Sequence, residues 1–425
     1  PITHDEITKC INTLKTNKSS GCDNIVNEYI KSTVTTMLDF YVILFNKIFD
    51  SGVIPSQWTF GNIIHLYKNK GDITDPKNYR PITLISCLGK LFTSILNERL
   101  NQYADSVRLI LENQAGFRKN HCTLDHIFTL YSLIEISKYH KKKLYCAFID
   151  FEKAFDSVWR LGLWNKILLN NIDGKCFNVI TQLYNSIKSR VFSNGLYSEP
   201  FSCTVGVRQG ENLSPFLFAI YLNDLEDFLY SNNVKGLSFI STKFKSELNV
   251  YLKLFVLLYA DDTILLSETP EDLQHQLTVF KNYCNYWHLK VNIDKTKVVI
   301  FGNSHTRKEV IPFTLNGEPL EIVDNFKYLG VLFCKNGSFN KNIRELFQKA
   351  TKAMYGVIGK CRKHNLAVDC TLDMFDKIVK PVMLYGCEVW GYNQSILIEK
   401  LHLKFCKHIL NVKPSTPNFM VYGEL

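Results

Sequence analysis

The sequence predicts an α+β fold made of two or three packed subdomains. Its 425 residues exceed the usual size of one compact domain, and a hydrophobic content of 46% supplies ample material for a core. Short apolar strands that end in tight turns are mixed along the chain with longer segments of helical spacing. The net charge of +10 favours a polyanionic partner.

Helices are expected where apolar residues recur every three or four positions. Ser214 is expected to cap one helix, with Pro215 in its first turn. Thr269-Pro270 has the same signature at the start of another. The segments expected to be mainly helical are 1–48, 89–100, 124–139, 214–225, 269–287 and most of the chain from residue 340 onward.

Strands are expected in short runs of apolar and β-branched residues. Asn194-Gly195 is a favoured two-residue hairpin turn. Residues 231–250 are polar and irregular, which predicts a surface insertion. The segments expected to be strands or hairpins are 63–67, 144–151, 190–204, 253–267, 297–301 and 326–333.

The thirteen cysteines are scattered and odd in number, which predicts free thiols in an intracellular protein. Cys387, His402, Cys406 and His408 lie close together but lack zinc-site spacing, so we expect no zinc there. No apolar run reaches the length of a membrane span. The start at Pro1 and the abrupt end suggest a piece of a longer polyprotein.

Two acidic segments stand beside apolar strands. Asp150 ends one such run, and Asp261 and Asp262 are adjacent acids in the turn of an apolar hairpin. Like charges held side by side near a core are costly unless a cation neutralises them. Mg²⁺ prefers oxygen ligands, and two such ions can drive phosphoryl transfer. The pattern predicts a phosphoryl-transfer site and leaves phosphatases, nucleases and polymerases open.

The segment Tyr259-Ala260-Asp261-Asp262 resembles the catalytic box of reverse transcriptases, and the segment around Asp150 resembles their first catalytic motif. Four more segments resemble family motifs in the right order: fingers motifs at 78–82 and 114–117, the template grip at 206–215 and the primer grip at 326–331. Residues 381–390 and 421–425 are similar to segments that follow the polymerase core in non-LTR (LINE-type) retrotransposons. The likeness covers nearly the whole chain.

This resemblance implies a right-hand polymerase with an antiparallel-sheet palm, fingers and a helical thumb. Asp150, Asp261 and Asp262 would bind two Mg²⁺ ions, with Mn²⁺ as a substitute and a backbone carbonyl of Ile149 or Phe151 assisting. The implied reaction is attack of a primer 3′-hydroxyl on a deoxynucleoside triphosphate, templated by RNA.

Further roles for the nucleotide site follow from the same resemblance. Phe155 would lie under the sugar and exclude a 2′-hydroxyl, with a plain core aromatic as the alternative. Arg80 and Lys68 would hold the triphosphate, and Lys70 is a rival to Lys68. Gln209 would meet the nascent base pair.

Other residues would hold the template and primer or move a proton. Gly210 would let the backbone approach the template closely, and Arg208 would contact the template or be a surface charge. Lys295 is a candidate general acid for the pyrophosphate, with Lys297 as its rival. The residues implied in the primer grip are Tyr328, Leu329 and Gly330.

The implied partners are an RNA template, a DNA primer or nicked target DNA, and deoxynucleotides. The basic helical end would grip a duplex by its phosphates. Its cations are Lys341, Arg344, Lys349, Lys352, Lys360, Arg362 and Lys363. Family analogy places the protein in the nucleus, the cytoplasm or both, and no endonuclease motif is evident.

We expect an N-terminal helical extension at 1–48, fingers and palm at 49–316, and primer-grip strands with a helical thumb at 317–425. Three alternatives stay open: a maturase-like reverse transcriptase, a viral RNA-dependent polymerase, and an inactive remnant that only binds nucleic acid. Phe155 argues against ribonucleotide use, and the intact acids with Gln209 argue against a remnant.

Overall fold

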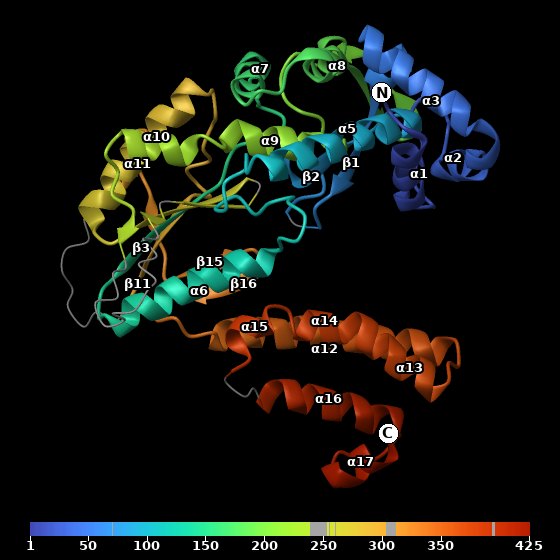
Figure 1. Ribbon diagram of the computed structural model, residues 1–425. Helices are drawn as coiled ribbons and strands as arrows, with labels where there is room; N and C mark the ends of the chain where they lie inside the picture. The colour runs from blue at the N-terminus through green and yellow to red at the C-terminus, as the bar shows by residue number, and fades with distance from the viewer. Residues whose placement is uncertain (70, 239–252, 255, 260, 303–311, 393–395) are drawn as a thin grey trace.

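The computed structural model describes residues 1–425 except 70, 239–252, 255, 260, 303–311 and 393–395. A large mixed body holds both main sheets, and a helical lobe formed by the end of the chain lies below it in Figure 1. Helix α6 (Thr123–Tyr139) runs between the two. The α+β class predicted from the sequence is confirmed. Most of the predicted 231–250 insertion lies outside the described residues.

A five-stranded sheet carries the predicted catalytic segments, and β3 (Leu144–Ile149) is its central strand. All six residues of β3 are buried, because both faces of the sheet are covered. β3 pairs antiparallel with β10 (Asp262–Ser267) and β11 (Lys297–Phe301). The edges are β9 (Val256–Tyr259), antiparallel to β10, and β14 (Glu321–Ile322), parallel to β11.

Alternate residues of β3 enter two different hydrophobic cores, as the two-residue period of a strand requires. Ala147 and Ile149 pack in the core that contains α9 (Ser214–Leu222) and α11 (Pro270–Tyr286). Cys146 and Phe148 pack in the core under α6. The predicted alternation along this strand is confirmed, and it brings Asp150 to the α6 side.

A second sheet forms the fingers, with strand order β2-β1-β4-β5 and β6 beside β4. β1 (Phe60–Tyr67) pairs antiparallel with β2 (Tyr79–Leu84) and parallel with β4 (Lys188–Ser193). The predicted Asn194-Gly195 turn joins β4 to β5 (Leu196–Tyr197), with φ of 51° and 81°. β6 is Phe201–Ser202.

The remaining helices of the body pack around these sheets. A capping box, in which Thr3 and Glu6 bond each other's backbone, fixes the start of α1. These helices are α1 (His4–Thr13), α2 (Asn27–Ser32), α3 (Val34–Ser51), α4 (Ser56–Thr59), α5 (Cys87–Ser106), α7 (Arg160–Leu169), α8 (Gly174–Asn185) and α10 (Leu225–Ser231). A short 3₁₀ helix spans Pro76–Asn78, and the small strand pairs are β7 (Leu237–Ser238) with β8 (Lys253–Leu254) and β12 (Thr314–Leu315) with β13 (Glu318–Pro319).

The chain from residue 340 onward is helical, as predicted. Helix α12 (Asn340–Lys363) packs its apolar stripe on the helices that follow and forms a third core with them. Those elements are α13 (Val368–Met374), a π-helical turn (Phe375–Val379), α14 (Lys380–Met383), α15 (Cys387–Trp390), α16 (Ile396–Ile409) and α17 (Asn418–Glu424). None of the helices within the described residues is long and apolar enough to cross a membrane.

Two local predictions were wrong. The expected strand 326–333 is a hairpin of β15 (Asn325–Tyr328) and β16 (Val331–Cys334), because Leu329 and Gly330 adopt positive φ and reverse the chain. Ser214 is not the helix cap: Leu213 is, and the Ser214 hydroxyl donates to the carbonyl of Arg208 instead. The helix also ends at Leu222, earlier than expected.

Candidate active site

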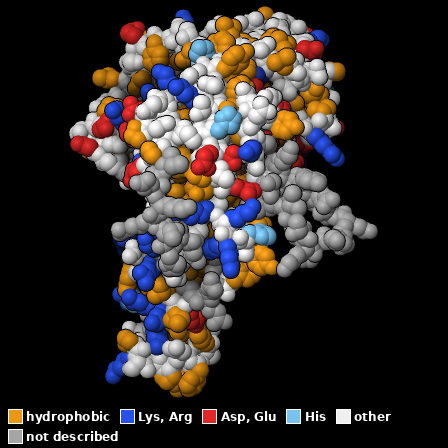
Figure 2. Space-filling view, turned by 90° about the vertical axis from the view of Figure 1, so that its left-hand side faces the viewer, with side chains coloured by type: hydrophobic (Ala, Val, Ile, Leu, Met, Phe, Trp, Pro, Cys, Tyr) orange, Lys and Arg blue, Asp and Glu red, His pale blue; other side chains and the backbone are white. Residues whose placement is uncertain are grey.

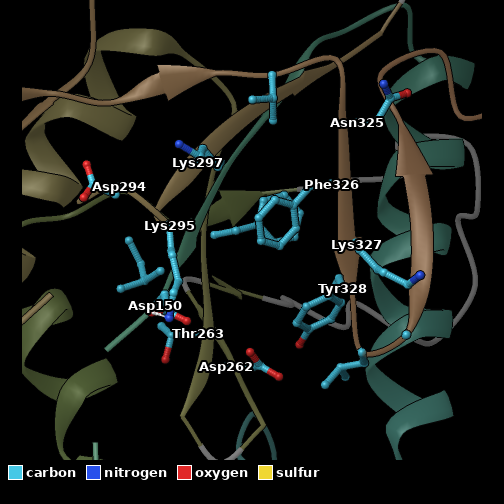
Figure 3. Close-up of a pocket in the computed structure, with 15 residues that line it drawn as sticks. Asp150, Asp262, Thr263, Asp294, Lys295, Lys297, Asn325, Phe326, Lys327 and Tyr328 are labelled. Atoms are coloured by element: carbon cyan, nitrogen blue, oxygen red, sulfur yellow. Dashed lines mark ion pairs between the residues drawn. The ribbon is translucent and has the colours of Figure 1, made fainter. Parts of the chain in front are cut away.

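The strand pairing places the three predicted catalytic aspartates at one end of the palm sheet. Asp150 directly follows β3, Asp261 lies in the turn between β9 and β10, and Asp262 begins β10. Thr263 pairs with Ile149, so Asp262 and Asp150 stand next to each other at the sheet end (Figure 3). Residues that are 111 or more positions apart in sequence therefore share one site.

The loop that carries Lys295 holds the backbone of Asp150, through Thr296 and Asn292, for which the sequence predicted no role. The Asp150 amide donates to Thr296 Oγ1 at 3.2 Å, and its carbonyl accepts from the Asn292 amide at 2.8 Å. Thr296 is fully buried. The loop therefore fixes the backbone position of Asp150, while its side chain stays partly exposed to solvent.

A cleft of about 660 Å³ opens beside these aspartates. Its walls come from the catalytic strand ends, from the loop containing Lys295 and from the β15–β16 hairpin, as Figure 3 shows. Asp150 and Asp262 both line it, and Ile149 and Thr263 contribute to its floor. The catalytic acids thus face a space large enough to admit a ligand group.

The carboxylates in this cleft resist ionisation. The pKa of Asp262 is raised to about 6, first because surrounding protein displaces water and then because Asp261 and Asp150 are like charges. Loss of water and the nearby Asp150 charge also raise the pKa of Asp261. Both side chains remain reachable by solvent. This repulsion favours the arrival of a cation.

Lys295 is the cation that the structure brings to the site. Its Nζ lies 3.4 Å from Asp150 Oδ2. The rival Lys297 pairs with Glu321 at 2.6 Å, although it also lines the cleft. The geometry therefore favours Lys295 over Lys297 for a role beside the reacting phosphates.

The chemistry of these donors fits a hard divalent cation, since three carboxylates share one sheet end and like charge raises the pKa of Asp261 and of Asp262. Their present geometry is more open than a bound site. In the parts of the chain that the structure describes, no three His, Cys, Asp or Glu side chains converge as a metal-binding group. To bind one cation together, the three aspartate side chains must rotate toward each other. Repulsion between their negative charges opposes that rotation.

Phe155 lies in the turn after Asp150 and is half-buried. Its ring stacks on Phe218 of α9, with centroids 4.8 Å apart, and meets the edge of Phe117 at 6.2 Å. Phe117 is 57% exposed. One side of the ring therefore packs on the core, and another side is open. This arrangement is compatible both with a core aromatic and with a ring that contacts a nucleotide sugar.

The predicted template-grip residues follow this turn closely in space. Gln209 donates from Nε2 to Asp156 Oδ2 at 3.0 Å, and its carbonyl accepts from Thr83 of β2. Gly210 has a φ of 103° and passes close to the Thr83 carbonyl. Gln209 therefore joins palm to fingers. The sequence reasoning named Gln209 but not its partner Asp156.

Arg208 is a buried residue, so the surface-charge alternative was wrong. Its guanidinium bonds both carboxylate oxygens of Glu211 at 3.2 Å and the Trp58 carbonyl at 3.0 Å. The Arg208 side chain is 6% exposed and that of Glu211 is 0% exposed. In this structure Arg208 anchors the loop that carries Gln209.

The two triphosphate candidates lie on the fingers hairpin and are not among the residues that line the cleft. Arg80 on β2 and Lys68 after β1 are both exposed. Lys68 Nζ donates to the Lys77 carbonyl at 2.8 Å. The rival Lys70 lies outside the described residues.

The primer-grip candidates form the turn of the β15–β16 hairpin. Tyr328 is 2% exposed, with its hydroxyl 3.3 Å from His126 Nδ1, so its ring is a packing element. A side chain at Gly330 would collide with Tyr385, whose hydroxyl donates to the Leu329 carbonyl. The hairpin tip is thus held against the cleft by the helical lobe.

The face in Figure 2 shows acidic side chains near the middle of the molecule and many Lys and Arg side chains on the lower, helical part. All thirteen cysteines are free thiols. The Cys387, His402, Cys406 and His408 set forms no metal group within the described residues, although Cys406 Sγ lies 3.6 Å from His402 Nε2.

Comparison with known proteins fits this geometry. The reverse transcriptase (RNA-dependent DNA polymerase) family matches residues 67–333. A probable RNA-directed DNA polymerase from transposon BS of Drosophila melanogaster is 28% identical, over 92% of this chain and 42% of its own length. The RNA-directed DNA polymerase from mobile element jockey of the same species is 25% identical, over 97% of this chain and 44% of its own length.

Two further matches cover less of the chain. A Pol polyprotein from the type-1 retrotransposable element R2 of Nasonia vitripennis is 26% identical, over 83% of this chain and 33% of its own length. A solved telomerase structure from Candida tropicalis aligns with a TM-score of 0.44 at 14% identity, over 76% of this chain and 62% of that chain. The chain spans less than half the length of each of the three curated relatives named above.

A palm sheet that is antiparallel except at its β14 edge, with acids at one end, flanked by a fingers sheet and a helical lobe, defines a right-hand polymerase. The chain belongs to the reverse transcriptase (RNA-dependent DNA polymerase) family. The predicted resemblance to non-LTR retrotransposon enzymes is confirmed by the mobile elements among its relatives.

Proposed function

We propose that the chain is an RNA-directed DNA polymerase that extends a primer 3′-hydroxyl with deoxynucleotides. The observation that carries the proposal is the placement of Asp150, Asp261 and Asp262 at one sheet end, where Asp150 and Asp262 line a cleft. The family match and the names of the relatives support the same reaction.

Asp150, Asp261 and Asp262 would hold Mg²⁺, or Mn²⁺ in its place, with the carbonyl of Ile149 or Phe151 assisting. Bound divalent cations supply positive charge that activates the attacking hydroxyl and neutralises the leaving pyrophosphate. The fixed Asp150 backbone limits the motion needed to bring its carboxylate into place.

Other residues position the nucleotide and move its proton. Lys295, 3.4 Å from Asp150, supports the phosphates and donates a proton to the departing pyrophosphate. Phe155 blocks space that a 2′-hydroxyl would need, because Phe218 supports its ring from below. Arg80 and Lys68 reach the triphosphate when the exposed fingers hairpin closes over the palm.

The helical lobe would hold the RNA–DNA duplex. Lys360, Arg362 and Lys363 crowd the last turn of α12. Phosphate contacts of this kind give sequence-neutral, salt-sensitive binding. A nicked chromosomal target as primer, and action in the nucleus after cytoplasmic assembly, belong to the same proposal, supported by the mobile-element names of the relatives.

Primer extension on an RNA template with Mg²⁺ tests the proposal. Wild type should incorporate deoxynucleotides, and Asp261→Asn should abolish incorporation while duplex binding persists. If both proteins bind duplex and neither polymerises, the chain is a nucleic-acid-binding remnant.

Phe155→Val gives a second test, directed at the sugar. Removing the ring should raise ribonucleotide incorporation relative to deoxynucleotide incorporation. An unchanged ratio would remove Phe155 from the nucleotide site and leave it as a core aromatic.

A further inference from the structure

A short segment, residues 113–115, pairs with the outer edge of β9. The Leu258 amide donates to the Asn113 carbonyl at 2.8 Å, and the Ala115 amide donates to the Leu258 carbonyl at 3.0 Å. β9 ends two positions before Asp261. Residues 113–115 therefore cover the edge of the strand that leads into the candidate active site.

The junction of α9 and α10 holds the chain around this segment. Asn223 Oδ1 accepts from the Leu111 amide at 3.2 Å, and Asn223 Nδ2 donates to the Leu109 carbonyl at 2.9 Å. Glu226, in the first turn of α10, adds a third contact, because its Oε2 accepts from Asn113 Nδ2 at 2.6 Å. This third contact is the one made by a residue that itself pairs with β9.

The contact with Glu226 satisfies only one end of the Asn113 side-chain amide. Asn113 is buried, with 7% of its surface exposed. Its Oδ1 has no hydrogen-bond partner among the residues that the structure describes. A buried amide oxygen without a donor is costly, so a donor at this place would stabilise the fold.

Glu226 supplies such a donor when its carboxyl group is protonated. A protonated carboxyl group has an O–H donor and an acceptor oxygen, and an amide offers the matching acceptor and donor. The two groups then join through two hydrogen bonds instead of one. Burial, followed by the charge of Asp227, raises the pKa of Glu226 to about 7. The protonated form is therefore populated at neutral pH.

The charged groups around Glu226 do not replace this proton. Asp227 in the same helix is an acid, which favours protonation, and among the described residues no cation pairs with Glu226. The other charged groups on the neighbouring chain are paired with each other, Arg118 with Glu112 at 3.4 Å and Lys166 with Asp224 at 2.5 Å.

The segment held by Glu226 continues to Phe117, which lies beside a predicted nucleotide-site residue. The Phe117 ring meets the Phe155 ring edge to face, with centroids 6.2 Å apart. Arg118 closes the loop behind it, because its Nη1 donates to the Leu111 carbonyl at 3.1 Å. The contact at Asn113 therefore bears both on β9 and on the ring that packs against Phe155.

We propose that Glu226 is a positioning residue whose protonated carboxyl group pairs with both ends of the Asn113 amide and holds residues 113–115 against β9. The pair fixes the strand that leads to Asp261. Ionisation of Glu226 removes one of the two hydrogen bonds, so the segment opens more readily as pH rises. The kinetic effect of the pair rests on the proposed polymerase function, and the pair itself does not.

Hydrogen–deuterium exchange of the Ala115 and Leu258 amides measures opening of the segment directly. The folded-state pKa of Glu226, about 7, lies above the unfolded value of roughly 4.3, so the closed segment binds more protons than the open one. After correction for intrinsic exchange, opening in wild type should increase about 10-fold from about pH 6 to about pH 8.

Glu226→Gln offers Asn113 the same two hydrogen bonds at every pH. It should keep the segment closed and abolish the pH dependence, whereas Glu226→Ala should open the segment at both pH values. Adding Asn113→Ala to Glu226→Ala should cause no further opening, because the two side chains act through one contact. Glu271→Gln, at an exposed acid in the first turn of α11, is the matched control and should behave as wild type.

Primer extension measures what the pair contributes to catalysis. In single turnovers from a preformed enzyme–duplex complex, Glu226→Ala should lower the rate about 3- to 10-fold, the effect expected from one hydrogen bond. The amplitude, which reports the fraction of folded enzyme, should not change. Glu226→Gln should restore the rate, and it also carries the test if Glu226→Ala does not fold.

A pH dependence of opening that persists in Glu226→Gln overturns the inference, and so does a Glu226→Gln variant that is as open as Glu226→Ala. An unchanged extension rate in an open Glu226→Ala variant overturns the positioning role. A wild type that extends no primer overturns the proposed function instead. The two failures are distinct, because the exchange measurement needs no polymerisation.

Discussion

The palm region holds two clusters of charged residues that follow opposite rules. At the catalytic sheet end three solvent-reached carboxylates gather, two of them lining the cleft, with Lys295 as a nearby cation. At the base of the Gln209 loop, Arg208 and Glu211 are buried and bonded through two 3.2 Å contacts. Three negative charges at the first cluster have one nearby cation, so they are only partly compensated, whereas charge at the second cluster is matched.

Tyr184 and Trp58 complete the matched cluster. The Tyr184 hydroxyl donates to Glu211 Oε2 at 2.9 Å, and the Trp58 carbonyl accepts from Arg208. Buried ions need such partners, because an unpaired charge in the interior is costly. The difference indicates that the partly compensated aspartates form a binding site for a cation, whereas the paired Arg208 and Glu211 stabilise the fold.

The largest effect is expected from Asp261→Asn. Loss of one metal-binding carboxylate should lower primer extension on the order of 10³-fold or more. Thermal stability should not fall, because removing one of three like charges relieves repulsion. Activity assays paired with melting curves measure both, and Asp227→Asn, an exposed acid of α10, is the matched control. A large loss of stability in Asp261→Asn would show that Asp261 stabilises the fold, as the Arg208–Glu211 pair does.

Arg208→Met should show the reverse pattern. It leaves Glu211 buried without its cation and should cost about 3–5 kcal/mol of unfolding free energy. Urea unfolding measures this, and Lys9→Met, which breaks the exposed Lys9–Glu98 pair, should cost far less, because solvent and salt screen an exposed ion pair. Equal costs for the two variants would contradict the proposed difference between the clusters.

Lys295→Ala should lower the polymerisation rate about 100-fold, because a general acid commonly contributes that much. Lys295→Arg keeps the charge but cannot release a proton at neutral pH, so it should rescue substrate binding and not the rate. Steady-state kinetics separate the effect on substrate binding, seen in KM, from the effect on the rate, seen in kcat. A comparable loss in Lys297→Ala, whose lysine pairs with Glu321, would reassign the role.

The smallest effect concerns pH and stability without divalent metal. The folded-state pKa of Asp262, about 6, lies above the unfolded value of roughly 3.9, so the native state binds more protons in between. Stability should therefore fall as pH rises from about 4 to about 6. Urea unfolding in EDTA measures this slope, which Asp262→Asn should reduce. Added Mg²⁺ should restore stability at the higher pH. An Asp262→Asn slope equal to that of wild type would show that other groups cause it.

The sequence was sufficient for the catalytic acids and for the mixed fold. Asp261 and Asp262 are adjacent in a strong hairpin pattern, and Asp150 ends a clear apolar strand, so local rules locate all three. The helical end and the Asn194-Gly195 turn were predictable for the same reason, since each signal is contained in a few neighbouring residues.

Contacts between residues far apart in the sequence could not be predicted from the sequence. The bond from Asp150 to Thr296 joins residues 146 positions apart, and nothing local marks Thr296 as its partner. Arg208 was expected to contact the template or to be a surface charge, because its pairing with Glu211 becomes evident only when both side chains are buried. The β15–β16 turn was missed because Leu329, with a φ of 44°, is not a residue that signals reversal.

The central position of β3 has a consequence for how the chain is made. Ala147 pairs with Val298, so the strand that leads to Asp150 waits for roughly 150 further residues to leave the ribosome. At about 5–20 residues per second that delay is roughly 8 to 30 seconds. Throughout it, a strand apolar on both faces has unsatisfied edges, the condition under which nascent chains aggregate or recruit chaperones. Catalytic competence is thus a late event of synthesis, and its timing falls on the most aggregation-prone strand of the palm.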